Sequence, residues 1–157
     1  MHDECRVILL ACWDGAAMNG RARHPLPATK PITPRILLVE DDTMQRYVMA
    51  EWLREFGYEV VEAASADEAK VLLSSVVAIQ VVITDVDMPG RMNGYDLADH
   101  VCRKSPSIPV IVASGRARQR QAGSVRSGHF VLKPYDPEAV TQLIATLLSS
   151  QGQPDEP

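Results

Sequence analysis

The 157-residue chain has few aromatic residues and no excess of positive charge. Aromatic side chains make up 5% of the sequence, and the formal net charge is −4. Proteins that bind nucleic acid non-specifically use a basic surface with aromatic side chains interleaved in it, and anionic membranes also attract basic surfaces. The composition therefore argues against nucleic acid and against a membrane surface as partners.

Cysteines and long apolar runs are scarce as well. The three cysteines, Cys5, Cys12 and Cys102, form no CxxC pair and no Cys/His metal spacing, which is typical of thiols in a reducing compartment. No apolar run approaches the roughly 20 residues of a membrane span. The short apolar run at 7–12 follows an acidic start, whereas a signal peptide starts with basic residues. We therefore expect a soluble, cytoplasmic protein.

The length and the patterning predict one domain with a short extension at each end. Residues 1–34 are punctuated by glycine and proline without a sustained period, so we expect a flexible N-terminal extension. Residues 150–157 are polar, so we expect a disordered tail. Between them, strand-like and helix-like patterns alternate over residues 35–149. This alternation is typical of an α/β domain with a parallel sheet.

Five apolar runs bounded by turn residues predict strands, and the segments between them predict helices. The first helix is expected at about 42–56, with Met44, Val48, Leu53 and Phe56 near one face. The segment 115–128 contains several arginines and few apolar residues, so a helix there is expected to be short, irregular or absent. The expected strands are 36–40, 59–63, a run ending at 85, 110–113 and 130–133.

Polar side chains stand at the carboxyl ends of four of these strands. The first strand ends in Glu40-Asp41-Asp42, the third in Asp85, the fourth runs into Ser114 and the fifth ends in Lys133. Because the carboxyl ends of parallel strands lie on one edge of a sheet, we expect these residues to meet there. Clustered carboxylates repel each other, and a hard divalent cation such as Mg²⁺ relieves that repulsion. A central aspartate can also act as a nucleophile and become an aspartyl-phosphate.

Four motifs in order, ILLVEDD, VVITDVDMPG, IVASG and FVLKPYD, make the chain resemble the receiver domain of two-component response regulators. The resemblance covers about residues 35–149 and implies a flavodoxin-like, doubly wound sheet with strand order 2-1-3-4-5. Neither flank is long enough for an output domain, so we expect a stand-alone receiver.

The resemblance also implies roles for the residues at the strand ends. Asp85 corresponds to the phosphoacceptor, which receives a phosphoryl group from a sensor histidine kinase or a phosphotransfer protein. Glu40 and Asp41 correspond to the acidic pair that binds Mg²⁺. Asp85 is a further metal ligand in the family, and the position of Asp87 supplies a backbone carbonyl. Lys133 corresponds to the lysine that contacts the phosphoryl group.

Three further positions match the family's conformational switch. Ser114 matches the switch hydroxyl, and Phe130 matches the switch aromatic residue. Pro134 matches the family's cis-proline, which turns the loop so that Lys133 faces the site. In the family, phosphorylation remodels the surface of which the fifth strand is part, and a downstream protein recognises the change.

Two other functions remain open from the sequence. A pseudo-receiver would bind a partner without being phosphorylated, and the short segment between Ser114 and Lys133 favours it. A phosphatase of the haloacid-dehalogenase type would use Asp85 as nucleophile and Asp87 as general acid. In those enzymes, however, the Asp-x-Asp strand is normally the first, and here it is the third. We therefore expect a signalling protein rather than an enzyme, with its downstream partner and oligomeric state undefined by the sequence.

Overall fold

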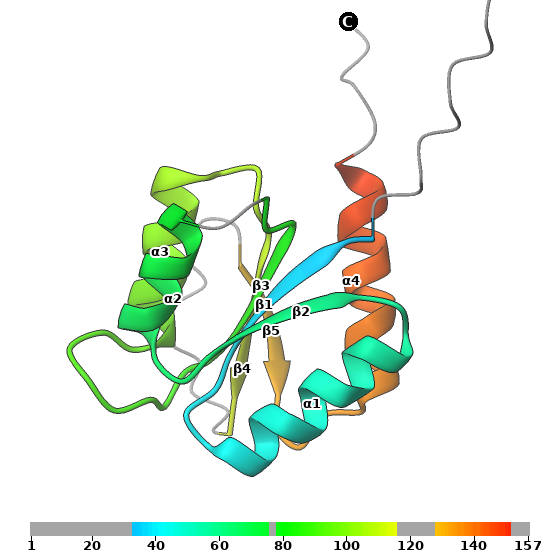
Figure 1. The fold of residues 1–157 in the computed structure, drawn as a ribbon, viewed down its shortest axis with the longest axis horizontal. Helices are drawn as coiled ribbons and strands as arrows, with labels where there is room; N and C mark the ends of the chain where they lie inside the picture. Colours follow the sequence, from blue (N-terminus) through cyan, green and yellow to red (C-terminus); the bar gives the residue numbers. More distant parts are fainter. Residues whose placement is uncertain (1–32, 76–77, 116–127, 152–157) are drawn as a thin grey trace, which may run out of the picture. The chain divides into compact units, whose positions relative to one another are not determined.

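Parallel strands and helices alternate along the computed structural model, which describes residues 33–75, 78–115 and 128–151 (Figure 1). The five strands form one sheet in the order β2-β1-β3-β4-β5. This order confirms the predicted flavodoxin-like, doubly wound fold class. The elements are β1 (Arg35–Val39), α1 (Thr43–Glu55), β2 (Glu59–Ala63), α2 (Ala66–Ser75), β3 (Val81–Asp85), α3 (Gly94–Lys104), β4 (Val110–Ser114), β5 (Gly128–Leu132) and α4 (Pro137–Ser150).

Helices cover both faces of the sheet. Helices α2 and α3 lie on one side and α1 and α4 on the other, and each pair encloses its own apolar core (Figure 1). The central strands β3 and β4 are buried at every position, and β1 is buried at four of its five. Burial on both faces explains why these strands are continuous apolar runs rather than alternating patterns.

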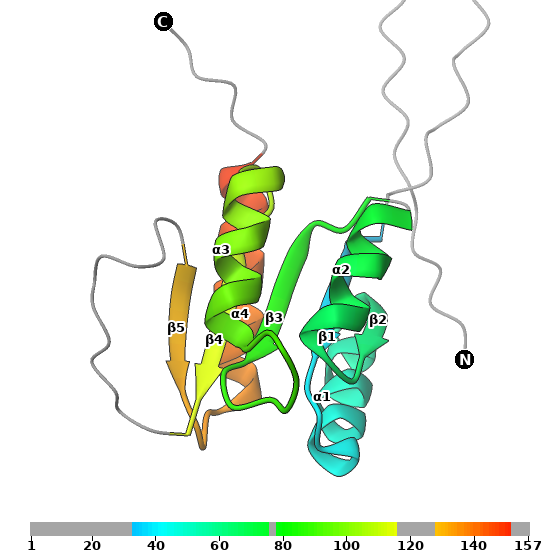
Figure 2. The same ribbon diagram turned by 90° about the vertical axis from the view of Figure 1, so that its left-hand side faces the viewer.

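The register of the ladder brings the strand ends to one edge of the sheet. Val39 at the end of β1 lies opposite Thr84 of β3, and Asp85 lies opposite Ala113 of β4. The residues that follow β1 and those that end β3 and β4 therefore stand on neighbouring strands at the same height. Figure 2 shows β4 and β5 side by side at one edge of the sheet.

The buried face of α1 differs from the one expected from the sequence. Met44, Val48 and Phe56 are 69%, 58% and 50% exposed, so their assignment to the inner face is wrong, whereas Leu53 is fully buried as expected. The reason is geometric: Leu53 follows Met44 by nine positions, about two and a half helical turns, which places them on opposite sides of the helix. The residues of α1 buried against the sheet are Met49, Ala50 and Leu53.

Strand β5 begins at Gly128, two residues before the expected start, because Gly128 and His129 continue the backbone ladder with β4 without forming an apolar pattern. The expected irregular fourth helix falls on residues 116–127, outside the described residues, so α4 is the helix that follows β5. The extension at 1–34 and the tail at 150–157 also lie almost wholly outside the described residues. Among the described helices, none combines the length and the apolar character that crossing a bilayer requires.

Candidate functional site

Two buried carboxylates stand side by side at the carboxyl edge of the sheet. Glu40 directly follows β1 and Asp85 ends β3, and their exposed fractions are 5% and 8%. The backbone N–H of Glu40 donates to the carbonyl of Ala63 on β2 (3.1 Å), which continues the ladder beyond the strand. Main-chain hydrogen bonds therefore fix where these two acids stand.

A third acid completes a cluster of carboxylates. Glu40, Asp41 and Asp85 each offer one carboxylate oxygen, and these oxygens all lie within 4.8 Å of one another. Asp41 is exposed, so the cluster opens to solvent on its side. An oxygen-only set of two or three carboxylates with a solvent-accessible side is the donor set that suits Mg²⁺, which keeps several waters when bound. The three residues predicted from the strand ends are thus brought together.

Lys133 reaches this cluster from the other end of the domain. Its Nζ lies 2.6 Å from Glu40 Oε2 and 3.2 Å from Asp85 Oδ1, forming two ion pairs. Burial alone would lower the pKa of Lys133, but the hydrogen bond and the negative charge of Glu40, helped by Asp85, outweigh it and raise the pKa. The ammonium is therefore held in its charged form between two acids.

Burial raises the pKa of Glu40, and the neighbouring Asp85 carboxylate raises it further. Lys133 acts in the opposite direction through its hydrogen bond and its charge, yet the pKa remains above the usual value. Lys133 thus does not fully offset the burial of Glu40 together with the charge of Asp85. A divalent cation would supply the missing positive charge.

Asp85, the candidate phosphoacceptor, is contacted through only one of its two carboxylate oxygens among the described residues. The backbone N–H of Val86 donates to Asp85 Oδ1 (2.8 Å), and Lys133 pairs with the same oxygen. Within the described residues, Oδ2 of Asp85 makes no comparable contact. Behind the strand, Gly94 at the start of α3 packs so closely that a Cβ there would overlap the backbone carbonyl of Asp85. The close packing of Gly94 restricts the position of the Asp85 backbone, while the carboxylate oxygen Oδ2 remains available for a ligand or a reaction.

The other predicted residues occupy the positions that the motifs indicated. Ser114 ends β4 and is buried, and its carbonyl accepts from the Lys133 N–H (2.8 Å). Phe130 lies on β5, is 52% exposed, and its ring centroid stands 6.1 Å from that of Tyr95. The Lys133–Pro134 peptide bond is cis. The Asp87 side chain is exposed and does not belong to the carboxylate cluster.

Sequence reasoning missed several residues around the cluster. Gln45 in the first turn of α1 accepts from Lys133 Nζ (3.2 Å) through Oε1, and the Arg46 guanidinium donates to the carbonyl of Glu40 (2.6 Å). Tyr95 and Gly94 contribute as described above. The only sequence signal for Gln45 and Arg46 is their place one turn after the acidic run, a weak indication for any single residue.

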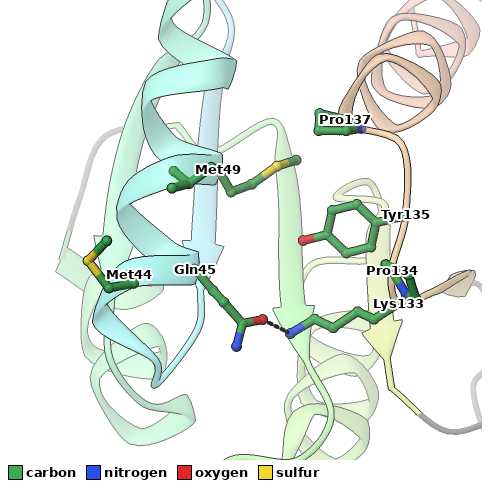
Figure 3. Close-up of a pocket in the computed structure, with 8 residues that line it drawn as sticks. Met44, Gln45, Met49, Lys133, Pro134, Tyr135 and Pro137 are labelled. Carbon is green, nitrogen blue, oxygen red and sulfur yellow. Dashed lines mark hydrogen bonds between the residues drawn. The ribbon is translucent and has the colours of Figure 1, made fainter.

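A groove of about 560 Å³ leads away from Lys133 between α1 and the segment that joins β5 to α4 (Figure 3). Figure 3 shows Lys133 and Gln45 meeting at one end, with Tyr135 and Met49 facing each other across the groove. Its lining is mostly apolar. It consists of Met44, Gln45, Val48, Met49, Lys133, Pro134, Tyr135 and Pro137.

The strand order and the acidic edge define a flavodoxin-like α/β protein whose site lies at the carboxyl ends of its strands. Residues 36–145 match the family model described as response regulator receiver domain. The chain therefore belongs to the response regulator receiver family of two-component systems.

Comparison with curated relatives and a solved structure agrees with this assignment. The chemotaxis protein CheY1 of Helicobacter pylori is 30% identical over 74% of this chain and 98% of its own length. The response regulator protein FleR of Pseudomonas aeruginosa is 33% identical over 71% of this chain. The matching region covers only 24% of the length of FleR. The structure of TrrA from Thermotoga maritima in complex with Mg(2+)-BeF is similar with a TM-score of 0.67 and 27% identity, over 73% of this chain and 99% of TrrA.

Proposed function

We propose that this protein accepts a phosphoryl group on Asp85 from the phosphohistidine of a sensor histidine kinase or a phosphotransfer protein, in the cytoplasm and with Mg²⁺ bound. The observation that carries the proposal is the cluster of Glu40, Asp41 and Asp85 with Lys133 inserted between two of its carboxylates. Membership of a signalling family supports this function over that of an enzyme with an external substrate.

Glu40, Asp41 and Asp85 would hold the cation, with the backbone carbonyl of Asp87 as a further ligand. The donor set fits, because every group is an oxygen and three carboxylate oxygens lie within 4.8 Å of one another, a concentration of negative charge that a cation relieves. When bound, Mg²⁺ supplies positive charge that draws the phosphoryl oxygens toward Asp85 and neutralises charge as it develops. The similar TrrA structure, which is in complex with Mg(2+)-BeF, supports this assignment.

In the proposed transfer, a carboxylate oxygen of Asp85 attacks phosphorus, the P–N bond to the donor imidazole breaks, and the imidazole leaves. Oδ2 is the candidate nucleophile, because Val86 and Lys133 both hold Oδ1. Lys133 would contact a phosphoryl oxygen and stabilise its negative charge. Hydrolysis would follow by attack of water on phosphorus, which returns Asp85 as carboxylate and releases phosphate.

Signalling would follow from a rearrangement that begins at Ser114. Its hydroxyl would move to a phosphoryl oxygen, and Phe130 would turn inward on the edge strand. Phe130 is half exposed and its ring faces that of Tyr95, so the aromatic side chain starts outside the apolar core into which it would turn. The protein would then act by binding a downstream partner or by passing the phosphoryl group along a relay.

The test is incubation of the purified protein with Mg²⁺ and acetyl phosphate, read by intact mass and by peptide mapping. The expected result is one phosphoryl adduct on Asp85, absent in Asp85→Asn and present in Asp99→Asn, whose carboxylate lies on α3 outside the cluster. No adduct under conditions where Mg²⁺ is shown to bind would overturn the proposal and favour a pseudo-receiver. An adduct that persists in Asp85→Asn would place the acceptor elsewhere.

A further inference from the structure

The ammonium of Lys133 has three acceptors, and only two of them are acids. Its Nζ donates to Glu40 Oε2 (2.6 Å) and Gln45 Oε1 (3.2 Å) and pairs with Asp85 Oδ1 (3.2 Å). An ammonium carries three N–H bonds, so these three oxygens use its whole capacity. Gln45 is the neutral member of the set.

The two acidic acceptors change during the chemistry proposed above, whereas Gln45 does not. Glu40 and Asp85 would share their oxygens with a cation, and Asp85 would become an acyl phosphate with less negative charge on its oxygens. Each of these events weakens their hold on Lys133. The amide oxygen of Gln45 is neither a carboxylate of this cluster nor a nucleophile, so these steps leave it available as an acceptor for Lys133.

The position of Gln45 is fixed by its own helix. Its backbone N–H donates to Asp42 Oδ1 (2.8 Å), the N-cap interaction of α1. Met44 and Val48 beside it line the groove shown in Figure 3, at whose end the amide meets the ammonium. Within the described residues the amide Nε2 makes no hydrogen bond, so the amide is oriented by Lys133 alone.

We infer that Gln45 is a positioning residue for phosphoryl transfer, which holds Lys133 over the site while its acidic partners are taken up by the cation and the phosphoryl group. This role rests on the proposed function, because it concerns the lysine that would contact the phosphoryl oxygens. Gln45 touches neither the phosphoryl group nor the cation in this role. It acts through Lys133.

The first test reads the Lys133 amine directly and does not depend on phosphorylation. Limiting acetylation by an amine-reactive reagent, followed by peptide mass spectrometry, compares Lys133 with Lys70 and Lys104 in the same sample. In Gln45→Met, which keeps the side-chain length and removes the acceptor, Lys133 is expected to react about three- to tenfold faster. Gln45→Glu restores an oxygen acceptor and is expected to return Lys133 to slow reaction, whereas Val48→Ala leaves it unchanged.

The second test measures the initial rate of adduct formation with acetyl phosphate and Mg²⁺. Gln45→Met is expected to form the Asp85 adduct about three- to tenfold more slowly than the wild type, with Val48→Ala at the wild-type rate. A wild-type adduct rate in Gln45→Met overturns the inference, even if Lys133 has become more reactive. If the wild type itself forms no adduct, the proposed function fails, and the acetylation result still shows whether Gln45 holds Lys133.

Discussion

Lys133 Nζ stands 2.6 Å from Glu40 Oε2, although 93 positions separate the two residues in the sequence. Both side chains are largely withdrawn from water, with 17% and 7% exposed. The contact joins the segment after β1 to the end of β5, so it crosses the sheet above β3 and β4. With the hydrogen bond from Lys133 to Gln45, it links the two ends of the domain at the candidate site.

Lys133→Met removes the positive charge that Glu40 and Asp85 share. Without a divalent cation, we expect the free energy of unfolding at pH 7 to fall by about 1–3 kcal/mol, since two crowded carboxylates lose their partner. Mg²⁺ is expected to recover part of this loss. Urea unfolding with EDTA or with Mg²⁺ measures both effects. Lys104→Met removes a lysine without an ion pair among the described residues, and an equal loss there would contradict the assignment.

Mg²⁺ is expected to stabilise the folded protein, because the carboxylate cluster exists only in the folded state. At one hundred times the dissociation constant, the gain is about 2.7 kcal/mol, and EDTA reverses it. Asp41→Asn is expected to weaken this stabilisation, since it removes one carboxylate of the set. Thermal unfolding over a Mg²⁺ titration provides the measurement. Glu55→Gln at the far end of α1 is the control, and the prediction fails if both variants respond to Mg²⁺ as the wild type does.

Gly94→Ala should disturb the candidate site without changing any of its side chains. A Cβ at Gly94 would overlap the backbone carbonyl of Asp85, so β3 and α3 must move apart. We expect a loss of about 1–3 kcal/mol in unfolding free energy and slower adduct formation at Asp85. At Gly115 an added Cβ meets no atom within 4 Å, so Gly115→Ala is the matched control. Equal stability of the two variants would show that the close approach does not constrain Asp85.

The corrected orientation of α1 makes a prediction about stability. Leu53→Ala empties a fully buried position and is expected to cost about 2–5 kcal/mol. Val48→Ala, on the exposed side of the same helix, is expected to change stability by less than about 0.5 kcal/mol. Chemical denaturation of both variants compares them directly. A large loss for Val48→Ala would instead place the inner face where the sequence pattern put it.

His100 on α3 is expected to titrate below its usual value of 6.5. Burial lowers the pKa of His100, and the positive charges of Lys70, Arg103 and Lys104 lower it further. Because the lowered pKa favours the neutral imidazole in the folded state, its contribution to stability is fully present above pH 6.5 and is lost as the pH falls from 6.5 through the lower pKa of the folded protein. NMR titration of the imidazole measures this pKa. Lys70→Met should raise it and Arg91→Met, on the loop before α3, should not. Unchanged titration in Lys70→Met would contradict the charge effect.

The sequence predicts the sheet and the acidic edge well, because both follow from strong local signals. Buried parallel strands are continuous apolar runs, and Glu40 and Asp85 stand where two of these runs end. The topology then places those ends together, so residues far apart in the sequence could be assigned to one site. The roles of individual residues came from the resemblance to receiver domains rather than from the pattern itself.

The sequence fails where a contact depends on helix rotation or on a close backbone approach. Met44 and Leu53 are both apolar, and only the turn of the helix between them decides which one is buried. In the sequence Gln45 is an ordinary polar residue in the first turn of a helix, and only the folded structure shows that Lys133, from the end of another strand, donates to it. No sequence motif around Gly94 indicates that it packs against the backbone of Asp85.

The backbone ladder between β1 and β3 also fixes the distance between the Cα atoms of Glu40 and Asp85, whatever side chains stand there. Val39 lies opposite Thr84, so the next residues, Glu40 and Asp85, are anchored one interstrand spacing apart, about 4.8 Å. Replacing the side chain of Glu40 or of Asp85 does not move these anchors, since they belong to the main chain. A glutamate in place of an aspartate only lengthens the tether by one methylene. Substitutions at these two positions therefore change the length and the charge of the side chains, while the spacing between their Cα atoms stays as the strand ladder sets it.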